Sequence, residues 1–256
     1  MRGFKAACRA EALKGRQSSL PWLCLGLPVL VALMAVLFFF LMPDSYRGAQ
    51  SPLMAYELWN WWAILQPALL ALVAESVMRR DSRQHLRPVL LLPLDPGVSF
   101  LAKTVIVLAW SLVANLVICL EGCLLPGLMG FVATPFPAGM AACLLNVATT
   151  AWLIPLGLWG TAAVGPTFGM ALPFLLEVGI GVSTWDTPIW WFLPPTASMN
   201  TTAPALGVLP NGLPVEAGSD LAVFGLRPLC SLLIALVCFL VLTLAGSRWF
   251  SRSEAV

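Results

Sequence analysis

Charge is what this sequence lacks most. Only 10% of its 256 residues are charged, whereas 59% are hydrophobic, and the mean hydropathy is +0.88. A soluble domain of this length needs roughly a quarter of its residues charged to cover its surface. We therefore expect lipid to surround most of the chain. The formal net charge of +2 is too small to favour nucleic-acid binding.

Residues that perform chemistry are also scarce. His85 is the only histidine, so the several histidine and acidic ligands of an intramembrane metalloprotease are missing. The sequence has no glycine-rich loop ending in Lys and Ser or Thr, so it cannot bind ATP in the P-loop manner. It has no Gly-x-Ser-x-Gly motif either. We expect a protein that is not an enzyme and that holds no metal or cofactor of its own.

The seven cysteines do not form a recognisable framework. Most of them lie within apolar runs, and no pair has the spacing of a metal knuckle. We expect them to act as small apolar packing residues. Cys119 and Cys123 lie four residues apart, so a disulfide between them stays open.

Six apolar stretches approach the 20 residues that cross about 30 Å of hydrocarbon. They cover residues 21–42, 57–78, 98–120, 138–164, 167–182 and 227–247. Only Gly165 and Pro166 separate the fourth stretch from the fifth. The first follows a basic stretch, but its length and the lack of a small-residue cleavage site predict a retained anchor helix rather than a signal peptide. The sequence thus predicts an all-α membrane protein, a single domain over residues 1–256 with six transmembrane helices.

The basic residues lie almost entirely on one side of these predicted helices. Of the 14 lysines and arginines, only Arg47 and Arg227 fall on the other side. The positive-inside rule therefore places the basic side in the cytoplasm. Six crossings return the C-terminus to the side of the N-terminus, and the basic tail agrees with this count.

The connection between the second and third stretches, residues 79–97, is the most informative polar segment. Glu75 can pair with Arg79 one helical turn later, where the second helix leaves the membrane. A basic run follows, and residues 89–92 are then unusually apolar for a solvated loop. Such a loop can face anionic lipid, but we favour a short helix that docks into a groove on a partner protein. Residues 1–20 similarly suit a cytoplasmic amphipathic helix on the inner leaflet.

Residues 183–226 form the longest connection on the other, extracellular side. Six prolines and three tryptophans lie in it. Tryptophan favours the headgroup level, so we expect this segment to lie along the outer surface, partly as short helices. Residues 121–137 are expected to form a smaller element of the same kind.

Few polar groups lie at membrane depth. Glu177 is the only deeply placed acid, and it can face the outer aqueous side through a broken helix pair, contact a substrate, or pair with an arginine. Gln66 and Asn146 are further candidates for a substrate path, although such residues more often bond across helices.

Two stretches carry a resemblance to a known family. One is Ala10-Glu11-Ala12-Leu13-Lys14-Gly15-Arg16 before the first helix, with Pro28 inside that helix. The other is Glu75, then Arg79-Arg80-Asp81, then Leu91-Leu92-Pro93, then Lys103. Together with the six-helix topology, they resemble the permease subunits of ABC-2 type ABC transporters, and within these the lantibiotic-immunity permeases. The resemblance implies an ABC-2 (type V exporter-like) permease fold with an N-terminal amphipathic helix.

The resemblance also implies a function and partners. A permease of this kind spans a bacterial cell membrane and expels an amphiphilic peptide, while a separate ABC ATP-binding subunit binds and hydrolyses ATP. It works with a second permease copy or a paralogous permease, in contact with membrane lipid. The implied ATPase-coupling residues are Glu75, Arg79, Arg80, Arg83, Arg87, Leu91, Leu92 and Pro93. The alternatives are an ABC-2 permease for another hydrophobic drug or lipid-like substrate, and a secondary carrier that uses Glu177.

Overall fold

The structure is a computed structural model that describes residues 2–48, 51–82, 95–216, 218–219 and 221–252. Within these ranges the chain is helical, apart from turns and one isolated bridge between Val208 and Pro214. Six helices are long and apolar enough to cross a membrane. The predicted all-α fold with six transmembrane helices is confirmed.

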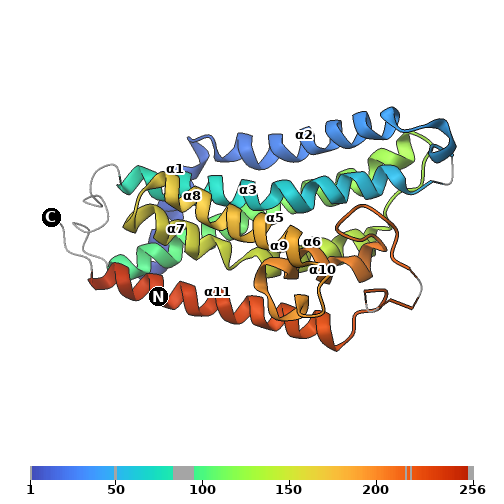
Figure 1. The fold of residues 1–256 in the computed structure, drawn as a ribbon. Helices are drawn as coiled ribbons and strands as arrows, with labels where there is room; N and C mark the ends of the chain where they lie inside the picture. The colour runs from blue at the N-terminus through green and yellow to red at the C-terminus, as the bar shows by residue number, and fades with distance from the viewer. Residues whose placement is uncertain (1, 49–50, 83–94, 217, 220, 253–256) are drawn as a thin grey trace.

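The elements follow one another as a bundle of roughly parallel and antiparallel spans (Figure 1). They are α1 (Arg2–Arg16), α2 (Leu20–Leu41), η1 (Asp44–Tyr46), α3 (Leu53–Ser82), α5 (Pro96–Leu128), α6 (Phe136–Thr150), α7 (Leu153–Ala163), α8 (Pro166–Phe174), the π-helical turn η2 (Leu175–Ile180), α9 (Gly181–Thr184), η3 (Trp190–Phe192), α10 (Pro194–Leu206) and α11 (Leu226–Arg252). The spans are α2, α3, α5, α6 with α7, α8 through α9, and α11.

Both ends of the chain lie at the same end of the bundle (Figure 1). We call this the basic end, because it carries α1, Arg79, Arg80, Arg248 and Arg252, and we call the opposite end the distal end. At the basic end α1 lies across the spans (Figure 1) and packs against α5. The amphipathic helix predicted for residues 1–20 is confirmed as a helix over Arg2–Arg16.

The buried centre of the bundle is built around α3 and the α6–α7 pair. About 61% of the most apolar stretch of α3 and 72% of that of α6–α7 are buried, against 22% for α11. Large apolar side chains such as Leu33, Leu37 and Leu233 are more than half exposed on α2 and α11. Exposed apolar faces of this size need lipid or another protein against them.

The reversal between the fourth and fifth spans lies where the sequence predicts it. Gly165 has φ +135°, a conformation that glycine adopts without a steric penalty, and Pro166 begins α8. The fourth span is itself broken between α6 and α7. The break has a covalent cause, because Pro155 has no N–H to donate to the carbonyl of Ala151.

Two predictions about the distal end need correction. The first concerns residues 121–137, since α5 continues to Leu128 and only the residues after it leave the helix. Pro126 does not end α5 earlier, because a proline in the last turn removes a single hydrogen bond. The chain then returns, and the N–H of Thr134 donates to the carbonyl of Gly122 at 3.0 Å.

The second correction concerns residues 183–226. Short helices form there as expected, but α10 does not lie along the surface. It packs against α6 and α11, and most of its residues are buried. The small side chains of Ala197 and Ala203 allow this close packing. Hydroxyl groups of α10 form hydrogen bonds with backbone carbonyls of the same helix; for example, Thr202 donates to the carbonyl of Ser198 at 3.0 Å.

Candidate functional site

Four charged side chains meet inside the basic end. Lys103, on α5, is completely buried, and its Nζ forms ion pairs with Glu11 Oε1 at 2.9 Å and with Asp81. Lys14 pairs with the same carboxylates, at 2.9 Å from Glu11 and 3.5 Å from Asp81. The two positive and two negative charges balance, which is the condition under which buried charges are tolerated. We call these four residues the charge cluster.

The charge cluster ties three helices together. Glu11 and Lys14 lie one turn apart on α1, Asp81 lies in the last turn of α3, and Lys103 lies near the start of α5. A further bond joins α1 to α3, because Arg80 donates to the carbonyl of Lys14 at 2.7 Å. Burial lowers the pKa of Lys14, but the carboxylates of Glu11 and Asp81 raise it more, so the net shift is upward. Helix α1 is therefore fixed to α3 and α5, the two helices that flank residues 83–94.

A second contact holds the start of α5 against the end of α11. Asp95 caps α5 by accepting from the N–H of Gly97 at 2.8 Å, and the hydroxyl of Ser251 donates to the same carboxylate oxygen at 2.7 Å. Gly97 has no room for a side chain, since a Cβ there would lie 2.8 Å from the carbonyl oxygen of Ser247. The last turns of α11 therefore rest directly on the first turn of α5.

The Asp95 contact predicts a dependence on pH. The hydrogen bonds from Ser251 and then Gly97 hold the pKa of Asp95 below its usual value. A lowered pKa in the folded state stabilises the fold above the unfolded value of about 4, and this gain is lost as the pH falls through the folded pKa. We expect Asp95→Ala to lower stability by about 0.5–2 kcal/mol at pH 7. Thermal unfolding should show this difference shrinking below about pH 4, and a constant difference would contradict it.

The predicted coupling residues are only partly within the described structure. Glu75 and Arg79 pair at 3.3 Å, as predicted. Arg83, Arg87, Leu91, Leu92 and Pro93 lie outside the described residues, so their docking role stays a prediction. The sequence places Lys103 beside this segment but does not reveal its partners. A lysine inside an apolar run needs buried acids, and Glu11 and Asp81 are two of the acids that the sequence offers at that end.

The polar residues at membrane depth bond across helices. Gln66 donates to Thr150 at 2.9 Å, while Trp62 and Asn146 both donate to the amide oxygen of Asn115 at 2.9 Å. These bonds join α3, α5 and α6. A substrate role for Gln66 or Asn146 stays a prediction, but Asn146 also lines a small cavity.

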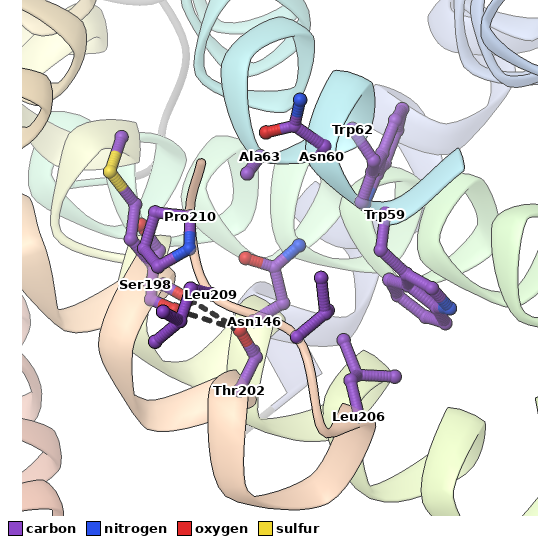
Figure 2. Close-up of a pocket in the computed structure, with 12 residues that line it drawn as sticks. Trp59, Asn60, Trp62, Ala63, Asn146, Ser198, Thr202, Leu206, Leu209 and Pro210 are labelled. Carbon is purple, nitrogen blue, oxygen red and sulfur yellow. Dashed lines mark hydrogen bonds between the residues drawn. The ribbon is translucent and has the colours of Figure 1, made fainter. Parts of the chain in front are cut away.

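That cavity lies between α3, α6 and α10, under residues 208–210 (Figure 2). Its volume is about 20 Å³, enough for one water molecule. We call it the inner cavity. Figure 2 shows Asn60, Asn146 and Thr202 around it, with the indole rings of Trp59 and Trp62 on one side.

Glu177 is completely buried, so the interpretation that it faces outer water is wrong. It lies in the π-helical turn η2, and its Oε1 accepts from the hydroxyl of Ser198 at 2.6 Å. Ser198 in turn lines the inner cavity. The cause of the burial is α10, which was predicted to lie on the outer surface but which packs over η2. No described basic residue pairs with Glu177.

The cysteines and acids of the described residues hold no metal site. No group of three or more His, Cys, Asp or Glu side chains is placed there to bind a metal ion. All seven cysteines are free, Cys119 and Cys123 included, and Cys24, Cys119 and Cys143 are buried as apolar packing residues.

Comparison with known proteins identifies the family. Neither the curated proteins nor the solved structures contain a match. The family model described as "ABC-2 family transporter protein" matches residues 7–193, a region that includes the whole charge cluster and the spans from α2 to α9. With the six apolar helices, this match confirms the predicted fold class. The chain therefore belongs to the ABC-2 family of transporter proteins, as a membrane permease that works with an ABC ATP-binding partner.

Proposed function

We propose that this permease expels an amphiphilic peptide from a bacterial cell membrane, in the manner of lantibiotic self-immunity, and that its ATP-binding partner docks on residues 79–97. The observation that carries the docking site is the charge cluster. It joins α1, α3 and α5 around the two ends of the connection between α3 and α5. A push on that connection would reach three helices at once.

The proposed transmission has two branches. ATP-driven closure of the partner would move Asp81 on one side of residues 83–94 and Asp95 on the other. Movement at Asp81 passes to α1 and α5 through Lys103, and movement at Asp95 passes to α11 through Ser251. The ion pairs and the helix cap join particular atoms of neighbouring helices, so a movement of one helix would be passed to the next.

The membrane placement rests on charge. The positive-inside rule favours the cytoplasm for the basic end and for both termini, because 12 of the 14 basic residues of the sequence lie on that side of the predicted helices. The exposed apolar faces of α2 and α11 leave room for a second permease copy or a paralogous permease beside lipid.

Co-purification tests the docking site. We expect the permease to retain an ABC ATP-binding subunit on a tag column, and replacement of residues 89–92 by Asp to abolish this retention, because charges remove the apolar docking face. Leu213→Asp is the matched control, since Leu213 is an exposed leucine of the distal end. Equal retention by the permease with and without the four substitutions would refute the docking site.

Vesicle transport separates the proposal from its alternatives. With both subunits reconstituted, ATP should drive release of a purified lantibiotic from the bilayer. Transport driven by a pH gradient without ATP, and lost in Glu177→Gln, would instead identify a secondary carrier. ATP-driven movement of a hydrophobic drug or lipid, but not of the peptide, would assign a different ABC-2 substrate.

A further inference from the structure

Glu177 is a buried acid whose counter-charge the described chain does not supply. Its Oε2 has no hydrogen-bond partner among the described residues, and α8, α9 and α10, which pack around η2, carry no charged residue. The charged side chains of α3, the fourth neighbour, are Glu57 near the distal end and Glu75, Arg79, Arg80 and Asp81 near the basic end. An ionisable group at membrane depth normally has a partner. A partner missing from the described residues points to a ligand.

A larger hollow lies at the distal end, and we call it the vestibule. Its volume is about 410 Å³, and its lining includes Trp185, Asp186, Trp190, Glu216 and Arg227. The lining therefore includes two carboxylates and one guanidinium group. Neither Asp186 nor Glu216 forms an ion pair with another residue in the described part of the chain.

Leu209 separates the vestibule from the inner cavity. It lines both hollows. Its N–H donates to the carbonyl of Leu213 at 2.8 Å, and the neighbouring bridge between Val208 and Pro214 closes a small hairpin over the inner cavity. Beyond Leu209, the inner cavity reaches Ser198, the residue that contacts Glu177.

We propose that the vestibule, the inner cavity and Glu177 form one route for an organic cation, which enters past Leu209 and pairs with Glu177. Carboxylates beside tryptophan rings are the chemistry that recognises ammonium, guanidinium and phosphonium groups. Trp185 and Trp190 supply the rings in the vestibule, and Trp59 and Trp62 supply them in the inner cavity. The inner cavity has room for only one water molecule in this conformation, so the cation would stay in the vestibule until Leu209 moves. This inference rests on the proposed export function and adds that the exported molecule is cationic.

Binding of tetraphenylphosphonium tests the route. The full-length permease alone, in nanodiscs of zwitterionic lipid, would be titrated with the labelled cation by equilibrium dialysis. We expect saturable binding that neutral triphenylphosphine oxide does not displace. Glu177→Gln should weaken binding at least tenfold, and Asp186→Asn with Glu216→Gln should do the same. The matched control is Asp44→Asn, which changes a distal carboxylate outside both hollows and should change binding less than twofold.

The two vestibule substitutions lie on exposed side chains, so they keep the test decisive if Glu177→Gln fails to fold. Three results would each overturn the route. They are an absence of saturable cation binding to the unsubstituted permease, equal displacement of the cation by the neutral compound, and unchanged affinity of the vestibule double variant for the cation. The ATP-binding subunit is absent from this experiment. If the permease binds the cation but retains no ATP-binding subunit in the co-purification experiment, the proposed function fails and the route stands. If it retains the subunit but binds no cation, the route fails and the proposed function stands.

Discussion

Replacing Lys103 by Met is expected to lower stability by about 3–5 kcal/mol, because it leaves two buried carboxylates with one partly exposed lysine between them. Lys103 is completely buried, and Glu11 and Asp81 are each less than a tenth exposed. Lysine and methionine side chains have similar lengths, so the packing around residue 103 changes little. The loss of stability therefore measures the loss of the positive charge. Thermal unfolding in detergent would measure it.

A second substitution identifies the cause. Asp81→Asn added to Lys103→Met restores the charge balance, and we expect it to recover part of the loss. Lys5→Met, on the exposed face of α1, is the control and should change stability by less than about 0.5 kcal/mol. If Lys103→Met were as stable as Lys5→Met, the charge cluster would have no structural role and the proposed transmission to α1 would fail.

The second large effect is expected at Gly169, where α8 crosses α7. A Cβ at this position would overlap the side chain of Thr161 and lie 2.7 Å from its Cα. Backbone cannot move aside as a flexible side chain can, so Gly169→Val should cost about 3 kcal/mol, at the upper end of overpacking effects. The measurements are the thermal midpoint and the yield of folded permease.

Gly26→Ala is the matched control for Gly169→Val. Gly26 lies on the exposed side of α2, and a Cβ there meets nothing within 4 Å. Alanine should be neutral or stabilise α2 by about 0.5–1 kcal/mol, because glycine is a poor helix residue. A similar response of the two glycines would show that α7 and α8 do not depend on close backbone contact.

Much of the fold could be predicted because lipid imposes a simple rule. Each crossing needs a run of about 20 apolar residues, and all six runs are visible in the sequence. The Gly165-Pro166 pair was the only sign of the reversal between the fourth and fifth runs, and the structure places the turn there. The ends of the helices were harder to predict. The sequence offers no polar residue between 122 and 131 to end α5, and only the structure shows the helix continuing to Leu128.

The site was harder to predict, because its contacts join residues far apart in sequence. Glu75 and Arg79 lie one turn apart on one helix, so their pairing follows from spacing alone. Lys103, Glu11 and Asp81 come from three helices, and only the packing of α1 against α5 brings them together. Glu177 was misplaced for the same reason. Its environment depends on α10, a helix whose prolines and small polar residues do not look like a buried segment in the sequence.

The length of α5 has a consequence for the surrounding bilayer. Its 33 residues extend over about 50 Å, well beyond the roughly 30 Å of hydrocarbon. The helix must therefore tilt or project its ends among the headgroups. Because Lys103 and Asp95 attach α1 and α11 to one end of α5, a thinner or thicker bilayer changes the inclination of all three helices together. We therefore expect acyl-chain length to act mechanically on this permease, in addition to the proposed push from its partner subunit.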